Sequence, residues 1–270
     1  MNDLSGKIIV VSGGTQGLGE ATARQCAAAG AAGLVLAGRS RDKGDALATE
    51  LTAGGTATIF VEADMGDAAA PAVVADAADA RFGVVHGLVN VAAATFRDNI
   101  WDATPDGWDT MFALNVRAPF FLIQACARIM RREVVKGSVV SIGSMSGYGG
   151  QPFLASYCAS KGALNTMTRN VAYALMRHGI RVNQVNPGWM DTEAEDAVQR
   201  KFHDADDGWL AAAEAGQPFG RLVKPDEVAR TIVFCLSDDS GLLTGSIIDF
   251  DQSVVGAGDA PKPSVAETPQ

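Results

Sequence analysis

The 270-residue sequence predicts an α/β protein in which seven mostly parallel strands form one doubly wound sheet with helices on both faces. Short apolar runs alternate with longer segments of helical periodicity, which is the pattern of strand–helix–strand units joined by right-handed crossovers. Most of the apolar runs are continuous rather than alternating. That is expected for strands covered by helices on both faces.

Each predicted strand is a short apolar run bounded by glycine or polar residues: 7–13, 33–38, 57–64, 86–92, 137–144, 180–188 and 245–251. Two segments between them carry apolar residues at spacings of three and four, which predicts long helices. The stripe residues are Met111, Leu114, Ala118, Leu122 and Ala125 in one helix, and Leu164, Met167, Val171 and Leu175 in the other.

No composition break divides the chain, so we expect one domain over residues 1–255. A polar-rich segment at about 190–217 interrupts the strand–helix rhythm, and we expect it to be a mobile lid over the substrate. Residues 256–270 are rich in proline and have little to bury, which predicts a C-terminal tail.

Composition narrows the range of partners. The formal net charge of −9 argues against nucleic acid or an anionic membrane, because both require a basic surface. No apolar run approaches the roughly 20 residues of a membrane span. The four cysteines and three histidines are scattered without metal-ligand spacing, so we expect no metal site and reduced thiols in a cytoplasmic protein.

A glycine turn follows the first predicted strand. Gly13, Gly17 and Gly19 lie between that strand and the next helix. Such a Rossmann-type turn lets the backbone approach a dinucleotide pyrophosphate, while the helix N-terminus supplies N–H donors. In a chain with 30 glycines the trio could instead form a tight structural turn, but its place after the first strand favours cofactor binding.

The end of the second strand should select the cofactor. Gly38 stands where an acidic residue would bind the ribose 2′-hydroxyl, and Arg39 follows it. A guanidinium can pair with a 2′-phosphate, and Ser40 and Arg41 could assist, so NADP is favoured. NAD remains the alternative because the glycine turn holds Gln16 and no basic residue. Asp64 could accept a hydrogen bond from adenine or cap the next helix.

Tyr157 and Lys161 are four residues apart on a predicted helix and therefore share a face. A free phenol has a pKa near ~10, and a cation one turn away should lower it. Tyr157 could then exchange a proton with a hydroxyl or carbonyl group. The alternative is a packed tyrosine beside a lysine whose ammonium group reaches solvent.

Two further polar residues strengthen this interpretation. Ser144 ends the fifth predicted strand, and open α/β sheets bind ligands at the carboxyl ends of their strands. Asn115 lies within an apolar helix stripe, and Pro119 cannot donate to its carbonyl oxygen, so the helix should kink there. The free carbonyl could hold a water molecule that links Lys161 to solvent.

Together these motifs resemble the short-chain dehydrogenase/reductase family, compact single-domain branch, over residues 5–252. The stretches that carry the resemblance are "SGGTQGLG", "NVAA", "LNVRAPF", Ser144, "YCASK", "NPG" and "LTGSIIDFDQS". In "NVAA", Val91 and Ala93 depart from the family pattern N-N-A-G. The alanine adds a methyl group where the backbone passes close to the cofactor.

The resemblance implies a role for each matching residue. Tyr157 would be the acid/base, Lys161 would lower its pKa and hold the nicotinamide ribose, Ser144 would stabilise the substrate oxygen, and Asn115 would anchor the relay water. The implied cofactor-binding residues are Ser12, Gly13, Thr15, Gln16, Gly17, Leu18, Gly19, Arg39, Ser40, Asp64, Met65, Asn90, Ala92, Tyr157, Lys161, Pro187, Gly188 and Thr192.

The implied function is an NAD(P)-dependent oxidoreductase that interconverts a secondary alcohol and a ketone, or a hemiacetal and a lactone, in a homotetramer or homodimer. The polar lid favours a small-molecule substrate such as a sugar, polyol or sugar acid. Candidate substrate contacts are Ser146, Gln151, Trp189, His203 and Trp209. Arg97, Arg200 and Lys201 could meet an anionic group or form a solvated charged surface. The alternatives are a 3-oxoacyl or other carbonyl reductase and a non-catalytic nucleotide-binding regulatory protein.

Overall fold

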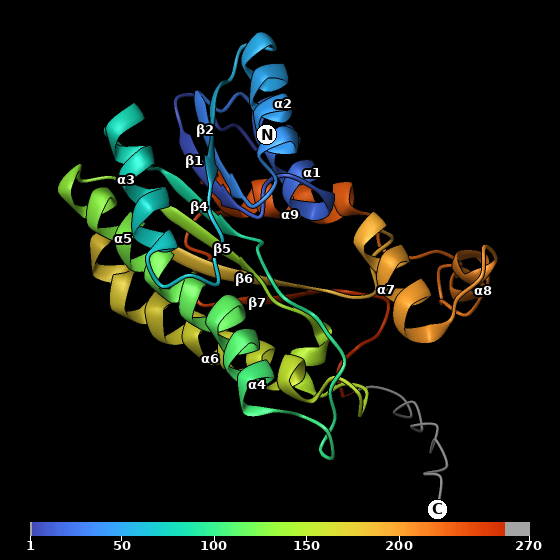
Figure 1. Cartoon of the computed structure of the whole chain (residues 1–270). Coiled ribbons are helices and arrows are strands. Elements are labelled where there is room, and N and C mark those ends of the chain that lie inside the picture. Colours follow the sequence, from blue (N-terminus) through green and yellow to red (C-terminus); the bar gives the residue numbers. More distant parts are fainter. Residues whose placement is uncertain (1, 257–270) are drawn as a thin grey trace, which may run out of the picture.

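Seven parallel strands form one sheet in the order β3-β2-β1-β4-β5-β6-β7 in this computed structural model, which describes residues 2–256 (Figure 1). They are β1 (Ile8–Ser12), β2 (Gly33–Gly38), β3 (Ala57–Glu62), β4 (Gly87–Asn90), β5 (Ser138–Ile142), β6 (Arg181–Pro187) and β7 (Ile247–Phe250). Every predicted strand is present and the predicted fold class is confirmed. The tail predicted for 256–270 lies, beyond its first residue, outside the described residues.

Strand order reverses between β1 and β4, which pair side by side, with β2 on the other side of β1. A crevice opens at the carboxyl ends of strands at such a reversal. One expectation is corrected here: β3 and β7 are only partly buried, although their sequences are nearly continuously apolar. They are the two edge strands, and helices cover an edge less completely.

Helices cover both faces of the sheet (Figure 1). One layer holds α1 (Gly17–Ala28), α2 (Arg41–Ala53) and α9 (Pro225–Leu236), and the other holds α3 (Ala70–Phe82), α5 (Ala118–Arg132) and α6 (Ala155–Leu175). Alternate residues of β2 serve the two cores: Leu34 and Leu36 pack on the first layer, whereas Val35 packs with the second. A continuous apolar run is required because each face of the sheet needs its own set of apolar side chains.

The chain from α4 (Pro105–Phe112) to α5 is helical throughout but contains a π-helical turn, η1 (Ala113–Arg117). Pro119 follows this turn, so the predicted irregularity at Asn115 takes the form of a widened turn. By length and composition alone, the whole helix Pro105–Arg132 could cross a membrane, and 44% of its most apolar window is buried in the protein. Its apolar residues include Leu122, Cys126 and Met130 of the core that α5 shares with α3.

The predicted lid consists of two helices, α7 (Glu193–His203) and α8 (Trp209–Ala215), which extend beyond the carboxyl ends of the strands (Figure 1). The Thr192 side chain caps α7 by accepting a hydrogen bond from the Glu195 amide at 3.0 Å. The remaining short helices are η2 (Met145–Tyr148), η3 (Met176–His178) and η4 (Asp238–Ser240). The motion of the lid stays a prediction.

Candidate active site

A groove of about 350 Å³ lies at the carboxyl ends of β1 to β4, where the strand order reverses. It brings together most of the predicted cofactor-binding residues: Gly13, Thr15, Gln16, Gly17, Leu18, Arg39, Ser40, Asp64, Met65, Ala92 and Thr192. Ala93, which the sequence also placed beside the cofactor, is in the lining as well. The sequence interpretation did not name six other lining residues as cofactor contacts: Gly38, Ala63, Val91, Leu114, Met190 and Ala194. Seven predicted residues are not in its lining: Ser12, Gly19, Asn90, Tyr157, Lys161, Pro187 and Gly188.

The glycines of the turn have different physical roles. Gly13 and Gly17 have φ angles of 72° and 52°, in the left-handed region that favours glycine. A Cβ atom on Gly13 would also lie 2.7 Å from the Ala92 amide nitrogen. Gly19 is needed for packing, because its Cβ would lie 1.9 Å from the Gly13 carbonyl oxygen. The predicted role of Gly19 in binding cofactor is therefore indirect: it lets α1 start against its own turn.

Replacing Gly19 with alanine is expected to lower the melting temperature, because the turn must shift to admit the methyl group. Overpacking of this kind costs about 1–3 kcal/mol of unfolding free energy. Gly54→Ala is the control, since its Cβ would meet its nearest neighbour, the Leu51 carbonyl oxygen, at an ordinary 3.4 Å. Equal melting temperatures for the two variants would contradict the packing role of Gly19.

Arg39 is exposed at the end of β2, and no carboxylate among residues 2–256 lies within 4.0 Å of its guanidinium. Arg41, two residues later, pairs with Glu62 at 2.6 Å. Asp64 accepts a hydrogen bond from the Gly66 amide at 2.9 Å, so it closes a local turn. It does not cap α3, which begins at Ala70. Arg39 therefore lies in the groove lining with a guanidinium that no carboxylate of residues 2–256 neutralises.

Tyr157, Lys161 and Ser144 come together where η2 packs on α6. Lys161 is buried, and its Nζ donates to the Ile142 carbonyl oxygen at 2.8 Å and lies 5.6 Å from the centre of the Tyr157 ring. The contact of η2 with α6 is tight, since a Cβ on Gly147 would lie 3.1 Å from the Lys161 carbonyl oxygen. This packing holds Ser144, at the start of η2, near Tyr157, where its hydroxyl acts to lower the pKa of the phenol.

The structure contradicts the prediction that Lys161 lowers the pKa of Tyr157. Burial raises the pKa of Tyr157, while a hydrogen bond with Ser144 acts in the opposite direction. Burial also lowers the pKa of Lys161 to about 8. The physical reason is that both groups lose water, and the ammonium group donates to the backbone of β5. The phenol is therefore held in its protonated form at neutral pH.

Asn115 is buried in the π turn and joins three segments through its side chain. Its Nδ2 donates to the Ala94 carbonyl and to Ser160 Oγ, both at 3.0 Å, and its Oδ1 accepts from the Ala94 amide at 2.8 Å. Ser160 Oγ in turn donates to the Tyr157 carbonyl at 2.7 Å. The clamp fixes α6 beside the loop after β4. A water on the Asn115 backbone carbonyl stays a prediction.

Two predicted groove residues connect strands. Asn90 donates from Nδ2 to Ser141 Oγ at 3.3 Å and so links β4 to β5. Gly188 leaves β6 beside β7, and a Cβ there would lie 1.8 Å from Asp251 Oδ1. In the part of the chain that the structure describes, no group of three or more His, Cys, Asp or Glu side chains could hold a metal ion.

The sequence is similar to those of many known proteins. The family described as enoyl-(acyl carrier protein) reductase matches residues 13–253. An NADP-dependent (R)-specific alcohol dehydrogenase from Lentilactobacillus kefiri is 31% identical over 90% of this chain and 94% of its own. Galactitol 2-dehydrogenase from Agrobacterium fabrum is 32% identical over 92% of this chain and 97% of its own.

A solved short-chain dehydrogenase/reductase mutant from Serratia marcescens is 31% identical, covers 92% of this chain and 98% of its own, and has a TM-score of 0.82. The chain belongs to the short-chain dehydrogenase/reductase family. The predicted family and enzyme class are therefore confirmed.

In this short-chain dehydrogenase/reductase, three of the predicted substrate contacts lie on or beside the predicted lid. Trp189 and Trp209 have ring centres 6.2 Å apart, and their indole N–H groups donate to Glu195 and Asp196 of α7, each at 2.7 Å. His203, at the end of α7, packs edge-on against Phe153 with ring centres 5.4 Å apart.

The other two predicted substrate contacts precede α6. The Ser146 amide donates to Ser144 Oγ at 3.1 Å, and Gln151 is exposed. Contact of any of these residues with substrate stays a prediction.

Asp98 is a site residue that the sequence interpretation missed. It is buried in the loop after β4, and its Oδ1 accepts a hydrogen bond from the Ser156 amide at 3.0 Å, at the start of the tyrosine helix. No local pattern could identify it, since the two residues are 58 positions apart.

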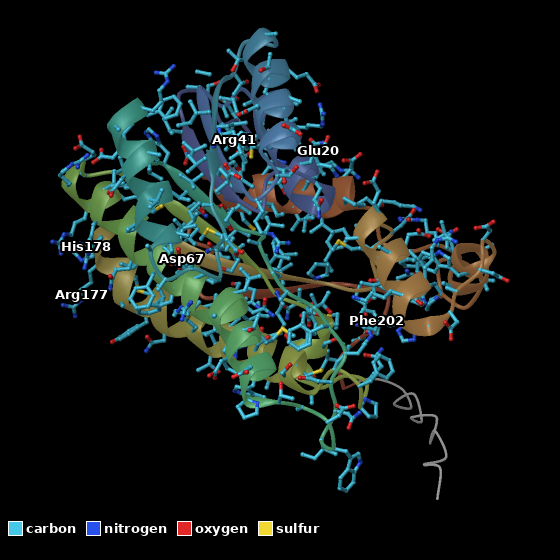
Figure 2. The ribbon with its side chains drawn as sticks, in the orientation of Figure 1. Glu20, Arg41, Asp67, Arg177, His178 and Phe202 are labelled. Carbon is cyan, nitrogen blue, oxygen red and sulfur yellow. The ribbon has the colours of Figure 1, made fainter. Side chains whose placement is uncertain are left out.

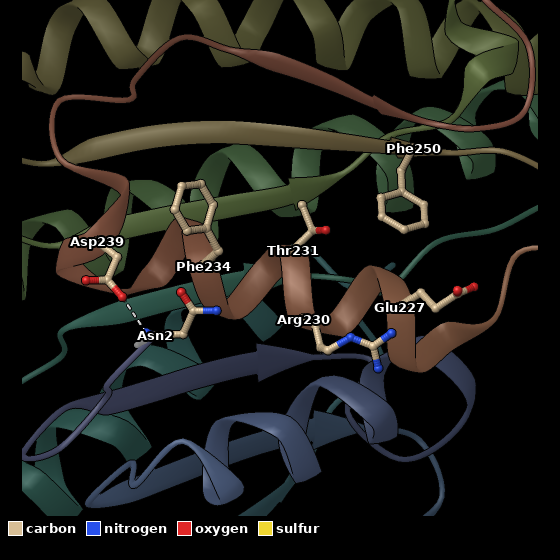
Figure 3. Close-up of a pocket in the computed structure, with 7 residues that line it drawn as sticks. All are labelled: Asn2, Glu227, Arg230, Thr231, Phe234, Asp239 and Phe250. Atoms are coloured by element: carbon tan, nitrogen blue, oxygen red, sulfur yellow. Dashed lines mark hydrogen bonds between the residues drawn. The ribbon is translucent and has the colours of Figure 1, made fainter.

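A second hollow, of about 550 Å³, lies between α9 and the N-terminal segment (Figure 3). Its lining residues are Asn2, Glu227, Arg230, Thr231, Phe234, Asp239 and Phe250. It contains none of the predicted site residues.

Proposed function

We propose that this protein is an NADP-dependent oxidoreductase that interconverts a secondary alcohol and a ketone, with Tyr157 as the acid/base. The single observation that carries the proposal is the continuity of two sites. Leu114 and Ala92 line the dinucleotide groove, while the adjoining Asn115 and Ala94 are bonded to each other and, through Ser160, to the tyrosine helix. A cofactor in the groove would extend toward Tyr157.

The groove fits an NADP molecule on its own chemistry. Gly13 and Gly17 leave the backbone open for a pyrophosphate, and the N-terminus of α1 faces the same groove. Arg39, which makes no ion pair with residues 2–256, offers its guanidinium to a 2′-phosphate, with Ser40 beside it. The bound nicotinamide would supply or accept the hydride.

Tyr157 moves the proton that accompanies that transfer. Because burial keeps the phenol protonated, it is ready to donate to a carbonyl oxygen in the reductive direction. Ser144 is close enough to influence the same phenol and would stabilise charge on the substrate oxygen. Lys161 would hold the nicotinamide ribose. It can do so as a cation below a pH of about 8, where its ammonium group is protonated.

A sugar, polyol or sugar acid is the substrate class that we propose. Helix α7 of the lid is rich in charged residues, and none of the residues of α7 or α8 is fully buried. Two relatives support this class by their names: the galactitol 2-dehydrogenase of Agrobacterium fabrum and a sorbitol dehydrogenase of Cereibacter sphaeroides. A long acyl chain would require a more apolar lid, which weakens the alternative of a 3-oxoacyl reductase.

We also propose a single domain, with the lid at about 190–217, assembled into a homotetramer or homodimer through α5 and α6. Support for this assembly comes from large apolar side chains that are exposed on these two helices, namely Phe120 and Phe121 of α5 and Tyr173 of α6. Met176, directly after α6, is exposed as well.

The test is a panel of polyols, sugars and sugar acids, with the matching ketones, assayed with NADP(H) and with NAD(H) by absorbance of the reduced nicotinamide. We expect turnover of at least one secondary alcohol, faster with NADP. Binding of NADP without turnover of any alcohol or ketone would instead favour the non-catalytic alternative.

A further inference from the structure

Arg97 lies in the loop after β4 with its charge held between two aromatic rings. Its guanidinium carbon is 5.2 Å from the centre of the Phe153 ring and 5.7 Å from that of Phe202, which lies near the end of α7 (Figure 2). Its Nε and Nη2 both lie against His203 Nε2, at 3.3 and 3.1 Å. No carboxylate of residues 2–256 lies within 4.0 Å of it.

The other two cations that the sequence offered for an anionic group are used differently. Arg200 donates to Asp196 at 2.8 Å and to Asp207 at 3.0 Å, so two carboxylates neutralise it. Lys201 is exposed and stacks its Nζ 4.9 Å from the Phe202 ring centre. Of these three residues only Arg97 is partly buried and lacks an acidic partner among the described residues.

Contacts of the next residue fix the position of Arg97 relative to the reacting tyrosine. The Asp98 amide donates to the Phe153 carbonyl at 3.1 Å, and its carboxylate accepts from the Ser156 amide, directly before Tyr157. Burial raises the pKa of the Tyr157 phenol and the charge of Glu195 also raises it, while the charge of Arg97 acts more weakly in the opposite direction. The hydrogen bonds of Asp98 therefore tie the loop that carries Arg97 to the start of α6, next to Tyr157.

We propose that Arg97, with His203 beside it, binds a carboxylate of the substrate, so that the enzyme acts on a hydroxy acid or sugar acid and its oxo acid. The inference rests on the proposed function and deepens it. A guanidinium presents a planar fork that matches a carboxylate, and the Phe153 and Phe202 rings flank that of Arg97. Two of the guanidinium nitrogens, Nε and Nη2, lie against His203 Nε2, which leaves the Nη1 donors for the ligand.

The experiment compares matched pairs of substrates that differ in one charge: gluconate against sorbitol, and 3-hydroxybutyrate against its methyl ester. We expect wild-type kcat/KM to be higher for the anionic member of the pair that is turned over. Arg97→Gln should lower kcat/KM for the anion by about 10- to 100-fold, mainly through KM, and change the neutral partner by less than about threefold. Arg97→Lys should retain part of the preference.

Arg200→Gln is the matched control, because it removes a lid cation that carboxylates already neutralise. We expect it to affect the anionic and the neutral substrate equally. If Arg97 only holds the lid to the core, Arg97→Gln will slow both members of each pair by the same factor, and the proposal is overturned. Equal wild-type kcat/KM for both members of each pair overturns it as well.

A binding measurement separates this inference from the proposed function. Gluconate is titrated into the protein with bound NADPH, where no oxidation can occur, and the Kd is compared between wild type and Arg97→Gln. Weaker binding to the variant by about 10-fold or more supports the anion site. An unchanged Kd overturns it even if the enzyme oxidises alcohols, whereas failure to oxidise any alcohol contradicts the proposed function instead.

Discussion

Tyr157→Phe is expected to lower kcat/KM by about 10²- to 10⁴-fold, the usual contribution of a positioned acid or base. The hydroxyl group that is lost interacts with Ser144, whereas the clamp from Asn115 through Ser160 holds the backbone carbonyl of residue 157. The variant should therefore keep its fold and bind NADPH normally. Initial rates measure the first effect, and a fluorescence titration of NADPH measures the second.

The direction of the tyrosine pKa adds a pH test. A phenol whose pKa is raised stays protonated as the pH rises, so wild-type reduction should not lose its acid in the neutral range. Loss of the Lys161 charge near pH 8 should then appear first, as an alkaline fall in kcat/KM. The residual rate of Tyr157→Phe should lack any further fall due to phenol ionisation. Activity near the wild-type level in this variant would remove Tyr157 from the mechanism.

Arg39→Asp is expected to weaken NADP binding by about 100-fold, because it removes a guanidinium–phosphate pair and adds repulsion. NAD lacks the 2′-phosphate, so its affinity should stay within a few-fold or improve through a hydrogen bond to the ribose. Stability should be unaffected because Arg39 is exposed and makes no ion pair with residues 2–256. The Kd values of both cofactors, measured by fluorescence, give the result.

Arg41→Asp is the matched control for charge. Arg41 is two residues away and pairs with Glu62 outside the groove lining. Screening by salt should limit its effect on NADP affinity to about threefold. If Arg39→Asp weakened NADP and NAD equally, the assignment of Arg39 to the 2′-phosphate would be wrong.

Much of the fold could be predicted because its signals are local. A strand between two helix layers is buried on both faces and is therefore mostly apolar along its length. This is why β1, β2, β4 and β5 could be predicted from nearly continuous apolar runs. That pattern cannot distinguish an edge strand from a central strand, because the order of the strands is set by crossover connections tens of residues long. This is why β3 and β7 were expected to be fully buried and are not.

The candidate site divides in the same way. The glycine turn, Arg39, Ser144 and the Tyr157–Lys161 pair could be predicted because each lies at a strand end or within one helical turn, where spacing determines position. The role of Gly19 in packing, the raised pKa of Tyr157 and the aromatic setting of Arg97 came only from the tertiary structure. Burial and partners decide these properties. The partners of Arg97 arrive from positions as much as 106 residues away, beyond the reach of any local pattern.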